Sequence, residues 1–188
     1  NATGVVHMDQ LNTKVRANSA LFTHYLLAFP LCSPSRSTIL TGRYPHNHRF
    51  VTNNDLKSSG FHPVQEEQTV NVWLHAAGYD TMLCGKYMNG YHADDASKAK
   101  HYVPPGWTDW FGFQTLHYFG STVNVNGKST KYPGDNYQTD IISNISLDWL
   151  TKRRGSARPF YACAACPEHV LCRICASCAG CRYRYIAP

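Results

Sequence analysis

The stretch CSPSRSTILTGR, residues 32–43, determines how the rest of this chain is interpreted. Ser33 is a residue type that favours a helix N-cap. Pro34 suits the first helical position, because its fixed φ matches a helix and it has no N–H to leave unpaired. Gly42 suits the position just after a helix. The stretch therefore predicts a helix from about residue 34 to residue 41, beginning just after Cys32.

The start of this predicted helix is electropositive. The unpaired N–H groups of a first helical turn and the helix dipole both favour a bound anion. Arg36 adds a permanent positive charge, and its planar set of donors suits an oxyanion. Cys32 is therefore expected beside an anion-binding turn. For a cysteine considered alone, the alternative is a buried residue ahead of an ordinary helix.

The order Cys-x-Pro-Ser-Arg, followed by Leu-Thr-Gly-Arg at 40–43, resembles the signature of the formylglycine-dependent sulfatases. The resemblance implies that a formylglycine-generating enzyme oxidises Cys32 to formylglycine. One hydroxyl of the aldehyde hydrate attacks sulfur and forms a covalent sulfate ester, and the second hydroxyl lets the aldehyde re-form and sulfate leave. The expected function is that of a sulfuric ester hydrolase, with an aryl or carbohydrate sulfate as substrate.

The remaining segments alternate between helical and strand patterns. Gly78 is placed to end a helix, and Asn126-Gly127 is a strong signal for a two-residue hairpin turn. The resemblance implies an α/β, alkaline-phosphatase-like sandwich whose mixed, largely parallel sheet is flanked by helices and is incomplete in this chain. Helices are expected over 69–77 and 136–153, and strands over 79–84, 119–125 and 158–162.

Lys86 follows the strand predicted over 79–84. The resemblance implies that this strand carries an active-site lysine at its carboxyl end, so Lys86 is expected to contact the sulfate; a solvated lysine is the alternative. Many arylsulfatases have histidine two residues later, where this chain has Met88. Asn89 is a candidate substrate ligand, and an asparagine held for turn geometry is the alternative. The run GKYMNGY at 85–91 resembles the branch of N-acetylglucosamine-6-sulfatases and algal-type arylsulfatases.

The resemblance also implies calcium, bound by paired aspartates after a first strand, with Cys32 as formylglycine among the metal ligands. Calcium takes about six to eight oxygen ligands, and neither Asp9 nor Asp55 alone can replace such a set. Residues 11–16 are read as the helix that follows the first strand. The first metal-binding strand is therefore expected to be missing, and the isolated chain is expected to have little or no activity. The pair Asp94-Asp95 is interpreted as solvated.

Most cysteines lie near the C-terminus, where six of the eight occur within 163–181. Three explanations remain open: a zinc or iron–sulfur site, disulfides formed in an oxidising compartment, or a change of reading frame or splicing. A Cys-rich metal-binding protein is the alternative function. The strictly spaced members are Cys172, Cys175, Cys178 and Cys181.

The family's pattern stops near Tyr161. Its next loop normally carries an active-site histidine, and His169 is a displaced candidate for that substrate-binding role. We therefore expect the N-terminal part of a sulfatase catalytic domain over 1–161 and an unassigned Cys-rich tail over 162–188.

The composition is that of a globular protein, with 43% hydrophobic and 16% charged residues. The formal charge of +6 is spread along the chain, apart from the block 152–154, so no nucleic-acid partner is expected. A positive field also attracts anionic sulfate esters. No apolar run is long enough to span a bilayer. Glycosylation sequons at Asn1 and Asn144 are compatible with a secreted, periplasmic, cell-wall or lysosomal protein.

Overall fold

Five helices and five strands make up the described part of the chain in the computed structural model. The helices are the π-helix η1 (Leu11–Val15) and the α-helices α1 (Cys32–Thr41), α2 (Pro45–His48), α4 (Val70–Ala76) and α5 (Gln138–Lys152). The strands are β1 (Asp80–Gly85), β2 (Asp109–Phe113), β3 (Thr122–Val125), β4 (Lys128–Lys131) and β5 (Phe160–Ala165). The structure describes residues 9, 11–16, 19–20, 22, 24, 26–53, 66–89, 91, 101–115 and 117–165.

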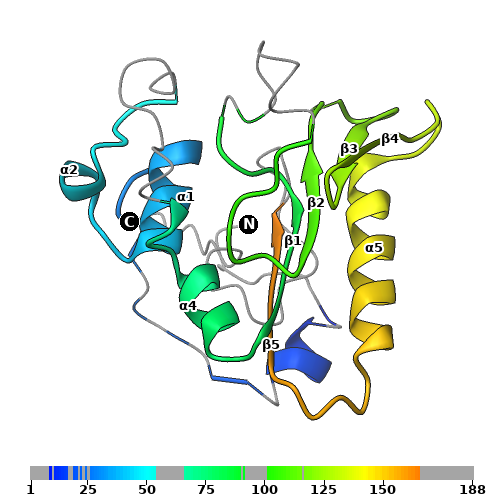
Figure 1. Ribbon diagram of the computed structural model, residues 1–188, viewed down its shortest axis with the longest axis horizontal. Helices are drawn as coiled ribbons and strands as arrows, with labels where there is room; N and C mark the ends of the chain where they lie inside the picture. Colours follow the sequence, from blue (N-terminus) through cyan, green and yellow to red (C-terminus); the bar gives the residue numbers. More distant parts are fainter. Residues whose placement is uncertain are drawn as a thin grey trace.

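The strands form one mixed sheet in the order β4-β3-β2-β1-β5. β1 pairs in parallel with β2 and with β5, whereas β2–β3 and β3–β4 are antiparallel. The turn between β3 and β4 is the predicted one, and Asn126 and Gly127 both have positive φ, at 48° and 89°. Figure 1 shows α1 and α4 on one side of the sheet and α5 on the other. The predicted α/β sheet between helices is confirmed.

Side chains of β1 alternate between two buried clusters, because successive strand residues point to opposite faces. Leu83 packs with Leu40 of α1 and with Trp110. Met82 and Cys84 pack with the apolar stripe of α5. A sheet covered on both faces is typical of α/β proteins. The helix expected over 136–153 is confirmed as α5, which buries Ile141, Ile142 and Trp149.

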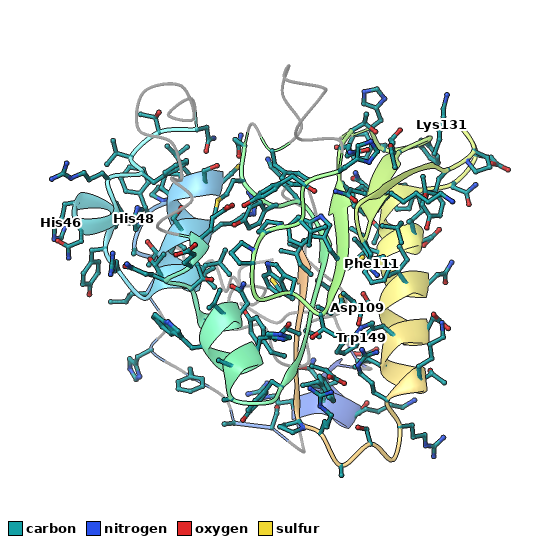
Figure 2. All side chains as sticks on the ribbon, in the orientation of Figure 1. His46, His48, Asp109, Phe111, Lys131 and Trp149 are labelled. Atoms are coloured by element: carbon teal, nitrogen blue, oxygen red, sulfur yellow. The ribbon has the colours of Figure 1, made fainter. Side chains whose placement is uncertain are left out.

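A charged cluster joins the C-terminal end of α5 to the amino ends of β1 and β2. Arg153 forms ion pairs with Asp80 at 3.2 Å and with Asp109 at 2.7 Å. Its guanidinium carbon also lies 3.6 Å from the centroid of the Trp149 ring. Trp149 donates its indole N–H to Asp109 at 2.8 Å, and Figure 2 shows these two side chains between β2 and α5. We call Arg153, Asp80, Asp109 and Trp149 the Arg153 cluster.

The carboxyl ends of the parallel strands β1, β2 and β5 lie at the end of the sheet opposite the Arg153 cluster. Lys86 follows β1 directly at this edge, and its N–H donates to the carbonyl of Ala165 at 2.8 Å. β5 runs to Ala165, so residues 162–165, which we had expected to open the tail, belong to the sheet. Cys163 is one of them and is buried in the core cluster on the α1 side.

Candidate active site

Helix α1 begins at Cys32, and the residue that caps it differs from the prediction. Its N-cap is Leu31, which makes no side-chain cap hydrogen bond. Ser33 lies inside the first turn, so the prediction of Ser33 as N-cap was wrong. The physical reason is an external cap, because Oδ1 of Asn53 accepts a hydrogen bond from the N–H of Ser33 at 3.1 Å. Gly42 ends the helix in the left-handed conformation, with φ 67°, as predicted.

The three predicted catalytic residues meet at this end of α1. Arg36 lies one turn after Cys32 on the same helix, and Lys86 reaches the site from the end of β1. Both cationic side chains are placed to hydrogen-bond to the sulfur of Cys32. Lys86 is only 6% exposed, which excludes the alternative of a solvated lysine. The catalytic roles of the three residues remain predictions.

The charges around Cys32 favour its anionic form. Burial of the half-buried thiol raises its pKa, but the charges of Lys86 and Arg36 and their hydrogen bonds outweigh burial. The pKa of Cys32 is therefore lowered from its ordinary value. The same two cations favour any anion placed at this position.

Arg36 has an unused donor in the site. Its Nη1 atom is buried and has no hydrogen-bond partner within the described part of the chain. Buried donors in proteins are nearly always paired, so an unpaired guanidinium nitrogen calls for an explanation. A bound oxyanion supplies one, because a guanidinium binds such groups through its planar set of donors.

The N–H groups of the first turn contribute less to this anion site than the sequence predicted. The N–H of Ser33 is bonded to Asn53, and that of Ser35 is bonded to the carbonyl of Leu31 at 3.0 Å. Pro34 has no N–H. Among the described residues, the side-chain donors that face Cys32 are those of Arg36 and Lys86.

Gly85 fixes the direction in which Lys86 leaves β1. Its φ is 117°, a conformation that other residues rarely adopt. A Cβ atom at this position would lie far inside van der Waals contact with the carbonyl oxygen of Ala165 on β5. The close approach of β1 to β5 at this point thus requires glycine.

The two residues singled out after Lys86 point toward α1. Asn89 accepts a hydrogen bond from the hydroxyl of Ser33 at 3.0 Å and donates its backbone N–H to the same oxygen at 2.8 Å. Met88 is 1% exposed, and its sulfur accepts a hydrogen bond from Ser37 at 3.8 Å. Asn89 therefore holds α1 in this structure, and its predicted substrate contact remains untested. His169 lies outside the described residues.

Sequence reasoning missed His48, which is fully buried beside α1. Its Nδ1 accepts the N–H of Phe50 at 3.0 Å, so the ring hydrogen is on Nε2, which bonds the hydroxyl of Thr38 at 3.1 Å. Burial lowers the pKa of His48. Figure 2 shows His48 at the end of α2, close to α1. Asn53 was also missed, and neither residue lies in a motif that could have identified it.

A buried carboxylate, Glu66, holds the residue after Lys86. Its two oxygens accept hydrogen bonds from Tyr87, at 3.0 Å, and from Tyr102. Burial raises the pKa of Glu66 and the tyrosine hydrogen bonds only partly oppose this. The neighbouring Trp107 and Trp110 are buried in the core.

The described residues do not fit a calcium site. They contain no group of three or more His, Cys, Asp or Glu side chains that could hold a metal ion. The groups that face Cys32 are cations, whereas calcium binds oxygen atoms. Asp9 is exposed near η1. Asp55, Asp94, Asp95 and the cysteines of 166–181 lie outside the described residues.

Comparison with known proteins identifies the family. The family model described as Sulfatase matches residues 2–167. The chain belongs to the sulfatase family. Human N-acetylglucosamine-6-sulfatase is 40% identical to it over 173 residues, which cover 87% of this chain and 31% of the human protein. An extracellular sulfatase SULF-1 homolog of Drosophila melanogaster is 36% identical over 152 residues, covering 77% of this chain and 13% of that protein.

This sulfatase chain thus spans less than a third of the length of either relative. A protein solved in complex with its substrate, D-glucosamine-2-N,6-O-disulfate, has the same fold, with a TM-score of 0.57 and 24% identity. The match covers 80% of this chain and 28% of the solved protein. No helix in the described part of the sulfatase chain is long and apolar enough to cross a membrane.

Proposed function

We propose that the sulfatase containing this chain hydrolyses sulfate esters, and that Cys32, converted to formylglycine, is the site of attack. The observation that carries the proposal is the cluster of Cys32, Arg36 and Lys86, in which Nη1 of Arg36 is buried and has no partner among the described residues. Membership of the sulfatase family and 40% identity to N-acetylglucosamine-6-sulfatase support it.

The residues present suit the converted side chain. When formed, formylglycine hydrate supplies an attacking hydroxyl and a second hydroxyl that allows sulfate to leave. Arg36 and Lys86 orient the group at position 32 and bind the sulfate oxygens, with Nη1 of Arg36 as a donor that no described residue occupies. Because both cations are held in place before substrate arrives, they stabilise developing negative charge without reorganising. The described residues do not form a calcium site, so no step is assigned to a metal ion.

The proposed substrate is a sulfated amino sugar. This proposal follows the name of the human relative, N-acetylglucosamine-6-sulfatase. The alternative substrate is an aryl sulfate. We further propose an extracellular or lysosomal location and a formylglycine-generating enzyme as partner, in keeping with the extracellular relative. Asn144 is exposed on α5, as a glycan would require.

Turnover tests the function. The whole protein, produced together with a formylglycine-generating enzyme, is assayed on N-acetylglucosamine 6-sulfate and on an aryl sulfate. We expect release of inorganic sulfate from the sugar. The Cys32→Ser variant should stop after one turnover with sulfate bound to residue 32, because serine has only one hydroxyl. Steady turnover by this variant would contradict the proposal.

A further inference from the structure

Two hydrogen bonds connect the start of α1 to the segment that leaves β1. The hydroxyl of Ser33 donates to Oδ1 of Asn89 at 3.0 Å, and the backbone N–H of Asn89 donates to the same hydroxyl oxygen at 2.8 Å. Ser33 is completely buried. Its hydroxyl is therefore fixed as donor and acceptor to one residue.

We propose that Ser33 and Asn89 form a positioning pair that sets the separation of Cys32 from Lys86 in the catalytic cluster. The inference rests on the proposed function, and it assigns Asn89 a role different from substrate binding. Ser33 directly follows Cys32, and Asn89 lies three residues after Lys86. The pair therefore connects the two elements that carry the nucleophile and the cation, close to where those side chains meet.

Asn53 holds the same turn through another atom. Its side-chain oxygen accepts the N–H of Ser33 at 3.1 Å, so two asparagines from different segments fix both the backbone and the hydroxyl of this serine. The peptide that carries Cys32 cannot move toward or away from Lys86 without breaking one of these bonds. Small displacements of a reacting group are costly, since about 1 Å can reduce a rate by about 10²-fold.

The kinetic test uses Asn89→Ala, Ser33→Ala and the double variant in the whole protein. Ser33 lies within the motif that the modifying enzyme reads, so each rate is divided by the formylglycine content from the mass of the Cys32 peptide. We expect Asn89→Ala to lower kcat by roughly 10- to 100-fold while KM changes by less than about twofold. Adding Asn89→Ala to Ser33→Ala should lower kcat no further, because Asn89 acts through Ser33.

Asn136→Ala is the matched control. Its side chain also makes one hydrogen bond, to Asp135 at 3.0 Å, but in an exposed turn before α5. We expect kcat and KM of this variant to equal those of the wild type. A raised KM for Asn89→Ala, with the same factor in the Ser33→Ala background, would show that Asn89 binds substrate directly and would overturn the proposal.

Hydrogen exchange separates failure of the pair from failure of the proposed function. In the whole protein, Asn89→Ala should speed amide exchange in the peptide 32–40, whereas Asn136→Ala should not. Faster exchange in a protein that hydrolyses no sulfate ester would sustain the structural pair and refute the catalytic function. Unchanged exchange and unchanged kcat in Asn89→Ala would refute the positioning pair alone.

Discussion

The two ends of the sheet each contain a partly buried arginine, and the arginines differ in how their donors are used. In the Arg153 cluster the guanidinium is paired with two carboxylates and covered by an aromatic ring. At the other end Arg36 faces Cys32 and Lys86, and its Nη1 has no partner in the described part of the chain. For these two partly buried arginines, the pairing of the guanidinium, rather than its burial, distinguishes a structural charge from one available to a ligand.

The largest expected effects come from replacing one cation at each end of the sheet, Lys86 at the Cys32 end and Arg153 at the other. Lys86→Met should reduce kcat/KM by about 10²- to 10³-fold, because a preorganised donor to the sulfate is lost. Arg153→Met should leave kcat/KM within a few-fold of wild type and lower the free energy of unfolding by about 2–3 kcal/mol, because Asp109 loses its cation and Asp80 is left with the more exposed Arg158. Urea unfolding and steady-state kinetics of both variants check this. If Lys86→Met lowered the free energy of unfolding and left kcat/KM unchanged, Lys86 would be a structural cation like Arg153, which contradicts the comparison.

Gly85→Ala should displace the backbone at the end of the sheet that carries Lys86. The new Cβ would clash with the carbonyl of Ala165, so β1 and β5 must separate where Lys86 begins. We expect the free energy of unfolding to fall by about 1–3 kcal/mol, with loss of turnover beyond that explained by unfolded protein. The exposed Gly134, where a Cβ would meet nothing within 4 Å, provides the control Gly134→Ala. Equal behaviour of the two variants would contradict the role of Gly85.

Predictions that depend on residues close together in the sequence were confirmed, whereas one that depends on a distant partner was wrong. The hairpin turn at Asn126-Gly127 and the helix α5 were predicted because both patterns are local. The predicted N-cap of α1 was wrong, because the N–H of Ser33 is bonded by Asn53, which lies 20 residues away and is connected to it by no motif. Likewise, the lack of a partner for Nη1 of Arg36 among the described residues depends on which side chains pack around it. The motif predicted which residues meet, and the structure was needed to show how each is held.

The reactivity of the unconverted Cys32 thiol depends on the positive charges of Lys86 and Arg36. Because Lys86 and Arg36 stabilise the thiolate, alkylation of Cys32 by iodoacetamide should reach half its maximal rate at a lower pH than for an ordinary cysteine. Lys86→Met should move this midpoint to higher pH, since a stabilising charge is removed. Peptide-resolved alkylation rates measure the midpoint, with Lys152→Met as an exposed control. A midpoint unaffected by Lys86→Met would show that the two groups do not interact.

The smallest expected effect concerns His48, which joins α2 to α1. Its folded pKa lies below the ordinary value of about 6.5, so at lower pH the unfolded chain binds a proton that the folded chain does not. Stability should therefore be fully present above about pH 6.5 and decrease as the pH falls through that value toward the folded pKa. Urea unfolding at about pH 7.5 and 5.5 should show a smaller decrease in His48→Gln than in wild type. An identical decrease would assign the pH dependence to other groups.

The mass of the peptide that contains Cys32, in protein recovered from its native source, tests the central claim most directly. The account predicts the mass of an aldehyde in place of the thiol. An intact thiol throughout that protein would leave the cluster of Arg36 and Lys86 without its attacking group and would contradict the proposed hydrolysis.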